Sequence, residues 1–285
     1  MNQKHKKGNR RKKQNKSTKR WELNRRWKYA FLLFGICMVA VVGCYRFFER
    51  YDGLGTEETI PVNQYNMEAV EVSGGRLSYE DDLYRSLQGI DVSSYQKKIN
   101  WKKVKADGID FAMIRLGYRG YREGELKLDS RFKENVKQAQ KAGLDIGLYF
   151  FSQAITPKEA IEEAKFVVKH IDGADISYPI AFDMEYIHGA DRINHLTIEE
   201  MTEIADAFCK TIAKKGYVPM IYGNPTWLTK HYDLRFLTEY QVWMAHYTEK
   251  TDYPYIFGIW QYSDKGKVDG IQGNVDMNLH LVLKN

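Results

Sequence analysis

The chain has 285 residues, 44% of them hydrophobic and 28% charged, with a formal net charge of +6 at pH 7 and three cysteines. This length leaves room for one large domain or two small ones. Cys37 and Cys44 lie in one apolar run, which leaves Cys209 alone in the remainder of the chain. An internal disulfide is therefore excluded there, and the fold must be stabilised by a hydrophobic core.

The positive charge is concentrated at the N-terminus. Residues 1–28 hold 13 of the 43 Lys and Arg residues but only Glu22 among the 37 acids, which leaves 30 basic and 36 acidic residues in the rest. A basic tail can bind nucleic acid. Its position directly before an apolar run favours a membrane flank instead, so we predict a basic cytoplasmic tail over residues 1–28 and expect no nucleic-acid partner.

The apolar run from Tyr29 to Tyr45 has seventeen residues without a charge, and Phe47 and Phe48 extend it to twenty. Twenty residues in a helix span about 30 Å, which matches the hydrocarbon core of a bilayer. Basic residues on the N-terminal side place that end in the cytoplasm. We therefore predict a single-pass signal anchor over residues 29–48, with the rest of the chain outside the cytoplasm at the cell membrane.

Two other interpretations of this run stay open. The stretch Val41-Val42-Gly43-Cys44 resembles the lipobox of bacterial lipoproteins, in which Cys44 would be acylated. The basic region before it is long for such a signal. The second alternative is a buried core helix, which the neighbouring basic tail disfavours.

Residues 49–87 have little apolar periodicity and are rich in Gly, Glu, Asp and Asn, as in YDGLGTEETIPVNQYN and SGGRLSYEDD. We predict that they form an extracytoplasmic stalk that holds the following domain away from the membrane, with no more than one turn docked.

From residue 88 onward, short apolar runs alternate with helical patterns, which implies a parallel sheet with right-handed crossovers. The expected strands are residues 88–92, 110–118, 144–151, 178–185, 218–223, 241–247, 257–263 and 275–281. The expected helices are residues 101–108, 130–143, 156–171, 197–216 and a short one over 224–230.

The last three strands leave no room for full helices between them. The eight strands fall within the 198 residues from Gln88 to Asn285. A complete eight-fold barrel usually takes roughly 250 residues. We predict an α/β fold, a trimmed TIM-like β/α barrel of eight strands and about five helices, preceded by one transmembrane helix. A doubly wound open sheet is the alternative, but no Gly-rich phosphate loop follows the first strand.

Four acidic residues fall at the strand ends of such a barrel. Asp183 and Glu185 close the fourth strand on one face, with Cα atoms roughly 6.5 Å apart. Asp91 ends the first strand, and Asp276 lies on the eighth, which neighbours the first in a closed ring. The Asp183-x-Glu185 pair alone would more often be an ordinary solvated strand end. Because barrel chemistry occurs at the C-terminal ends of strands, we expect the four carboxyl groups to form one site.

Crowded carboxyl groups suit the cleavage of a glycosidic bond. A carboxyl near other carboxylates and aromatic walls has a raised pKa, so it can stay protonated near neutral pH and act as a general acid. A neighbour that stays ionised can stabilise the oxocarbenium-like transition state.

Flat aromatic rings suit the apolar faces of sugars, although core packing is the commoner role of any single ring. We expect Tyr149, Tyr222 and Trp260 to line the cleft, because their strands end there. Tyr118, Gln261 and Tyr262 complete the predicted substrate-binding set.

We expect no cofactor and no metal. The histidines show no paired ligand spacing, which argues against zinc. Acid clusters also bind Mg²⁺, Ca²⁺ or Mn²⁺, so a metal site remains an alternative. Acyl-transfer chemistry is disfavoured, because the chain has no G-x-S-x-G motif and Cys209 lies in an expected helix.

Four blocks of the sequence resemble glycoside hydrolase family 25, the Chalaropsis-type lysozymes. They are GIDVSSYQKKINWKKVKADGIDFAMIRLGYRG, DIGLYFFSQA, PIAFDMEY and GIWQYSDKGKVDGIQGNVDMN, in this order between Gln88 and Leu283. The resemblance implies a trimmed β/α barrel over residues 88–285. It also implies N-acetylmuramidase activity, the hydrolysis of the β-1,4 bond between N-acetylmuramic acid and N-acetylglucosamine in bacterial peptidoglycan.

The family's proton donor falls on Glu185, its companion on Asp183, and the first-strand and last-strand acids on Asp91 and Asp276. The resemblance implies that Asp183 orients the acetamido group of the substrate as the nucleophile, with retention. The residues alone leave retention and inversion open, because the separation of the carboxyl groups distinguishes them. The chain departs from many relatives at Lys97 (Gly in those), Asn100 (Asp) and Phe150 (His).

The function expected from the residues and the resemblance is that of a membrane-anchored peptidoglycan hydrolase. Two alternatives stay open, a non-catalytic cell-wall-binding module of the same fold and a metal-dependent glycan hydrolase. The expected partners are the glycan strands of peptidoglycan and, through residues 29–48, the membrane. We expect the chain to be a monomer.

Overall fold

The structure, a computed structural model, describes residues 59–171 and 173–284. The predicted cytoplasmic tail, the signal anchor over residues 29–48, Cys44 and the first part of the predicted stalk lie outside these residues. Within the described part, no helix is both long enough and apolar enough to cross a membrane. All described residues belong to one unit that begins at Thr59.

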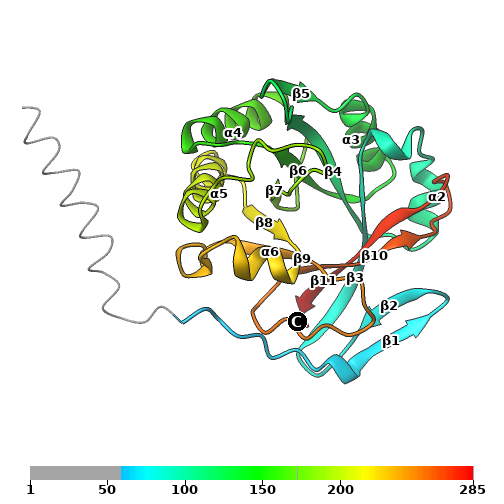
Figure 1. The fold of residues 1–285 in the computed structure, drawn as a ribbon. Helices are drawn as coiled ribbons and strands as arrows, with labels where there is room; N and C mark the ends of the chain where they lie inside the picture. The colour runs from blue at the N-terminus through cyan, green and yellow to red at the C-terminus, as the bar shows by residue number, and fades with distance from the viewer. Residues whose placement is uncertain (1–58, 172, 285) are drawn as a thin grey trace, which may run out of the picture. The chain divides into compact units, whose positions relative to one another are not determined.

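Eight strands close into a ring at the centre of this unit (Figure 1). They are β3 (Tyr84–Val92), β4 (Phe111–Arg119), β6 (Asp145–Ser152), β7 (Ile180–Met184), β8 (Pro219–Gly223), β9 (Gln241–Ala245), β10 (Ile259–Gly266) and β11 (Val275–Leu283). Every strand expected from the sequence is present. The predicted TIM-like barrel is confirmed, and the closed ring excludes the doubly wound open sheet. One further strand, β5 (Leu126–Leu128), pairs antiparallel with β4 outside the ring.

The last strand reverses direction. From β3 through β10 all neighbouring strands of the ring are parallel, whereas β11 runs antiparallel to both β10 and β3. A hairpin joins β10 to β11, so no crossover helix is needed. As a result, the N-terminal end of β11 lies beside the C-terminal ends of the other strands.

Five α-helices occur in the described residues, as the sequence predicts. They are α2 (Trp101–Ala106), α3 (Phe132–Lys141), α4 (Pro157–Ile171), α5 (Ile198–Ala213) and α6 (Pro225–Lys230), and they lie around the outside of the ring (Figure 1). Each lies in the connection between two successive parallel strands of the ring. The apolar faces of the helices and the outward-facing strand residues form one continuous core.

Side chains that point into the ring fill its lower part. Because side chains alternate along a strand, residues two apart share this interior. The interior cluster comprises Phe111, Met113, Ala181, Met220, Tyr222, Trp243, Ala245 and Ile259. Gly89 also faces the interior, and a Cβ there would collide with the Phe111 ring. The interior of the barrel is therefore packed with side chains. Space for a site remains at the end of the barrel where the parallel strands have their C-terminal ends, which we call the upper mouth.

The described part of the predicted stalk is folded against the barrel. Residues 59–87 include a hairpin of β1 (Val70–Ser73) and β2 (Arg76–Tyr79) and the first residues of β3. The Asn63 side chain donates hydrogen bonds to the carbonyl oxygens of Tyr253 (2.6 Å) and Tyr255 (3.2 Å). The Tyr65 hydroxyl donates to the carbonyl of Phe257 (2.6 Å). The predicted boundary at residue 88 thus falls inside β3, and the folded unit begins earlier than the sequence suggests.

Candidate active site

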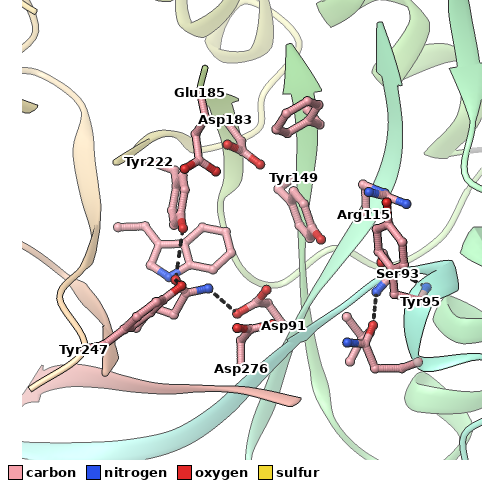
Figure 2. A pocket seen from close by; sticks show the side chains of 15 residues that line it. Asp91, Ser93, Tyr95, Arg115, Tyr149, Asp183, Glu185, Tyr222, Tyr247 and Asp276 are labelled. Carbon is pink, nitrogen blue, oxygen red and sulfur yellow. Dashed lines mark hydrogen bonds between the residues drawn. The ribbon is translucent and has the colours of Figure 1, made fainter. Parts of the chain in front are cut away.

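The four predicted acids line one pocket at the upper mouth of the barrel, with a volume of about 240 Å³. Asp91 lies near the end of β3, Asp183 is in β7, and Glu185 follows β7 by one residue. Asp276 is the second residue of β11, directly opposite Asp91 in the strand register. It reaches the mouth because β11 is antiparallel. Figure 2 shows Asp183 with Glu185 on one side of the pocket and Asp91 with Asp276 on the other.

A buried hydrogen-bond network holds Asp91 in place. Its Oδ2 accepts hydrogen bonds from the amides of Gln261 (2.8 Å) and Asn278 (2.9 Å). The Asn278 oxygen accepts from the Trp243 indole N–H (2.7 Å), and the Gln261 oxygen accepts from the Tyr222 hydroxyl (3.0 Å). Burial raises the pKa of Asp91 to about 6, with the two amide donors opposing the shift. Asp91 is therefore an oriented carboxylate at neutral pH.

Asp183 and Glu185 form a coupled pair. Burial raises the pKa of each, and the negative charge of Glu185 raises the pKa of Asp183 further. A hydrogen bond between the two carboxyl groups raises the pKa of Asp183 and lowers that of Glu185. The pair therefore keeps a proton to a higher pH than an isolated carboxyl group would. Asp183 Oδ1 is buried and has no hydrogen-bond partner among the described residues.

Asp276, which lies beside Asp91, also has a raised pKa. Burial raises its pKa to about 8, and the charges of Asp91 and Asp264 contribute. At pH 7 it is mostly protonated and can donate a hydrogen bond. The pocket thus holds carboxyl groups that differ in protonation state, which is the pattern of acid–base sites.

Three of the predicted substrate-binding residues, Tyr149, Tyr222 and Gln261, line the pocket. Burial raises the pKa of both tyrosines well above the ordinary value, so their hydroxyls stay neutral. The Gln261 oxygen also accepts a hydrogen bond from the Tyr247 hydroxyl (3.1 Å). These aromatic hydroxyls and rings give the pocket both polar contacts and flat faces.

The other three predicted residues do not line the pocket. Trp260 is only 1% exposed and lies in the outer core, where its indole N–H donates to the His246 carbonyl (2.8 Å). Tyr262 belongs to the same core. Because Gln261 points inward, its neighbours Trp260 and Tyr262 on β10 must point outward. Tyr118 contacts a pocket residue from outside the lining, with its ring centroid 5.5 Å from the Arg115 guanidinium carbon.

The prediction missed several residues that line the pocket. Trp243 and Arg115 face inward from β9 and β4, and Ser93, Gln96 and Tyr95 follow β3. Arg115 pairs with Asp129 (2.8 Å). The signal for Arg115 was present in the sequence, because Phe111, Met113 and Arg115 follow the period-2 pattern of one strand face. Arg115 places a cation at a pocket whose other charged residues are acids.

The carboxyl groups of the pocket are not arranged as metal ligands. Among the described residues, no group of three or more His, Cys, Asp or Glu side chains could hold a metal ion.

The chain matches a model of a known protein family. The family model described as "Glycosyl hydrolases family 25" matches residues 90–271. This range contains Asp91, Asp183 and Glu185, and Asp276 lies just beyond it.

Individual relatives agree with this match. The chain is 28% identical over 199 residues to "Uncharacterized protein YegX" of Escherichia coli O6:H1, covering 68% of this chain and 69% of that one. It is 29% identical over 204 residues to "Lysozyme M1" of Streptomyces globisporus, covering 67% of each. The structure of the modular autolysin LytC from Streptococcus pneumoniae superimposes with a TM-score of 0.60 at 25% identity. That superposition covers 74% of this chain and 52% of LytC, so the chain spans about half the length of that protein.

Proposed function

The chain belongs to glycosyl hydrolase family 25, and on this premise we propose that it is a membrane-anchored N-acetylmuramidase. Its substrate is the glycan strand of peptidoglycan, and the bond cleaved is the β-1,4 bond between N-acetylmuramic acid and N-acetylglucosamine. The observation that carries the proposal is the Asp183–Glu185 pair, which faces Asp91 and Asp276 across one pocket.

Glu185 is the general acid in this proposal. It is the more exposed member of its pair, so its carboxyl group can reach the glycosidic oxygen of a bound glycan. Burial raises its pKa, which favours the protonated form that donates to the leaving group. After proton transfer the Glu185 carboxylate can accept a proton from water in the second half of the reaction.

Asp183 lies beneath Glu185 and positions the substrate. Its Oδ1 has no hydrogen-bond partner within the described part of the chain, so it can accept the N–H of a 2-acetamido group that enters the pocket. Such a contact orients the acetamido oxygen toward the anomeric carbon, in line with the retaining route that the family resemblance implies. Asp91, held ionised by Gln261 and Asn278, stabilises the positive charge that develops on the sugar.

A Glu185→Gln variant tests the assignment of the acid. Without a dissociable proton at this position, we expect the release of reducing sugar from peptidoglycan to fall by at least about 10²-fold. Mass spectrometry of the fragments made by the wild-type full-length protein should show N-acetylmuramic acid at the reducing end.

Glu203→Gln provides the matched control, because Glu203 is an exposed residue of α5. It should retain full activity. Normal activity in Glu185→Gln would refute the assignment. Retention of the wild-type protein on peptidoglycan without any product would favour a wall-binding module.

The proposed anchor is the apolar segment over residues 29–48, which lies outside the described residues. Its support is the length of the run and the thirteen basic residues before it. After cell fractionation we expect the protein in the membrane, with its barrel accessible to external protease and its N-terminus protected. Recovery of the protein in the culture medium would contradict the proposed anchor. Acylation of Cys44 would show that the protein is a lipoprotein instead of having a signal anchor.

A further inference from the structure

A second hollow, larger than the active-site pocket, lies on the outer wall of the barrel. It has a volume of about 900 Å³ and is formed by the segment before α2, by α2 and α3, and by the turn between β10 and β11. We call it the basic groove. Its lining residues are Lys97, Lys98, Ile99, Asn100, Trp101, Lys102, Lys103, Arg131, Glu134, Gln138, Lys141, Ala142, Gly270, Ile271 and Gln272.

The charge of the basic groove is strongly one-sided. Six Lys and Arg side chains line it, against the single acid Glu134. Glu134 is already paired with Arg131 (2.6 Å). The five lysines are exposed and form no ion pair with any residue in the described part of the chain. Outside its first 28 residues the chain carries more acids than bases, so this cluster is not a reflection of overall composition.

One of these lysines occupies a costly backbone conformation. Lys97 has φ 56° and ψ −125°, and it is the only non-glycine residue with positive φ among those that the structure describes. This region favours glycine, because a Cβ is crowded there at a cost on the order of 1–3 kcal/mol. Strained residues of this kind often occur at ligand-binding sites, and Lys97 lines the basic groove.

The basic groove begins where the active-site pocket ends. Ser93, Tyr95 and Gln96 line the pocket, and the next residue, Lys97, lines the groove. The turn between them is firmly held by a capping box between Ser93 and Gln96. The far wall is also fixed, because the Asn100 N–H donates to the Gly270 carbonyl (2.9 Å). Consecutive residues thus line the pocket and the basic groove, and hydrogen bonds hold the segment between them.

We propose that the basic groove binds a phosphodiester-linked anionic polymer attached to the glycan strand that the pocket cleaves. Exposed lysine ammonium groups on flexible stems act as point charges that adapt to phosphates at variable positions. Binding of this kind releases counterions and weakens as salt rises. The inference that the polymer is attached to a glycan strand rests on the proposed function. The inference that the basic groove binds the polymer does not.

Photo-crosslinking tests the proposal on the purified full-length protein. The probe is poly(glycerol phosphate) carrying a photoreactive group, and crosslinked peptides are identified and quantified by mass spectrometry. This readout reports the groove separately from the basic residues 1–28, which are expected to attract the same polymer. We expect crosslinks in the segments from Lys97 to Lys103 and from Arg131 to Lys141, with yields that fall steeply with salt.

Two triple variants that lose the same charge distinguish binding in the basic groove from non-specific electrostatic attraction of the polymer to the protein. Replacing Lys98, Lys102 and Lys103 with Gln should reduce crosslinking to the Arg131–Lys141 segment at least about tenfold at low salt. The same change at Lys158, Lys165 and Lys169, which lie on α4, should leave it unchanged. Equal yields from the two triple variants would overturn the proposal.

Lys97→Gly tests the strained position with two readouts. Relief of the strain should raise Tm by about 2–4 °C, while crosslinking falls several-fold because a groove cation is lost. Unchanged or lower Tm would contradict the strain, and unchanged crosslinking would contradict a role of Lys97 in binding.

Competition identifies the chemistry of the partner. Unlabelled poly(glycerol phosphate) should displace the probe from the groove. Polyglutamate of equal charge and vesicles of phosphatidylglycerol should do so at least about tenfold less well. Equal competition by polyglutamate would overturn the phosphate class, and equal competition by vesicles would assign the groove to a lipid surface. These measurements of polymer binding need no catalysis. A protein that binds the polymer but cleaves no peptidoglycan would therefore refute the proposed function and still support binding by the basic groove.

Discussion

Two aspartates that face each other across neighbouring strands have different protonation behaviour. Asp91 and Asp276 are direct partners in the β3–β11 register, and burial raises the pKa of both. Asp91 receives two amide hydrogen bonds, from Gln261 and Asn278, which stabilise its charged form. The pKa of Asp276 is raised further, to about 8, by the charges of Asp91 and Asp264. Individual hydrogen bonds therefore decide which carboxyl of the pocket stays ionised.

An Asp276→Asn variant tests this difference through stability. The pKa of Asp276 is raised above its unfolded value, so the folded state binds more protons and its stability falls as pH rises from about 4 to 8. Asn cannot ionise, so the stability of the variant relative to wild type should increase over this window. We expect a relative gain of about 3 kcal/mol between pH 5 and pH 8.

Denaturant unfolding of both proteins at the two pH values measures the effect. Asp82→Asn is a suitable control, because Asp82 is exposed. A stability difference that does not change with pH would show that Asp276 has an ordinary pKa.

At the scale of elements, side-chain alternation and the direction of β11 position the site. On β4, β9 and β10 every second residue faces the ring, which brings Arg115, Trp243 and Gln261 to the mouth. The same alternation turns Trp260 outward. The antiparallel β11 carries Asp276 and Asn278 toward the mouth with its N-terminal end. Each of these placements needs close packing at the barrel floor.

Gly89→Ala tests that packing. A Cβ at Gly89 would collide with the Phe111 ring inside the barrel, so we expect a loss of about 1–3 kcal/mol in the free energy of unfolding. Gly258→Ala is a matched control, because the nearest atom to its new Cβ would be 3.7 Å away. Chemical denaturation measures both. Equal stability of the two variants would mean that the barrel interior around Gly89 and Phe111 can accommodate a methyl group without strain.

At the scale of the whole described unit, the segment before β3 completes the barrel. The Tyr65 ring packs edge-on against Phe257 (4.9 Å between centroids) and Tyr84 (5.1 Å). Phe257 precedes β10 and Tyr84 begins β3, so these contacts lie at the end of the barrel opposite the active site. The described residues before β3, from residue 59 onward, are thus part of the folded unit.

Truncation of Tyr65 measures the contribution of this segment. Tyr65→Ala removes the ring and the hydroxyl and should cost about 3 kcal/mol, whereas Tyr65→Phe loses only the bond to the Phe257 carbonyl and should cost about 1 kcal/mol. Thermal unfolding gives both values. Activity of either folded variant at 25 °C should match wild type, because the pocket is at the other end. A stability equal to wild type in Tyr65→Ala would mean that the segment is only loosely attached.

The sequence alone predicted the eight barrel strands, the five helices and the four acids of the pocket. These features leave periodic or local signals, because a buried strand is an apolar run and each of these acids interrupts an apolar run at or near its end. The docking of residues 59–87 left no such signal. It depends on single contacts, such as those of Asn63 and Tyr65, with partners about 190 positions away in the chain.

The tertiary structure alone decided three things. It set the reversed direction of β11, the inward or outward orientation of each aromatic residue at the mouth, and the union of separate lysines into one groove. Sequence determines which residues lie on the same face of an element, because that follows from local geometry. Which faces meet, and hence which carboxyl keeps its proton, depends on burial and on partners from distant strands, and these exist only when the ring closes.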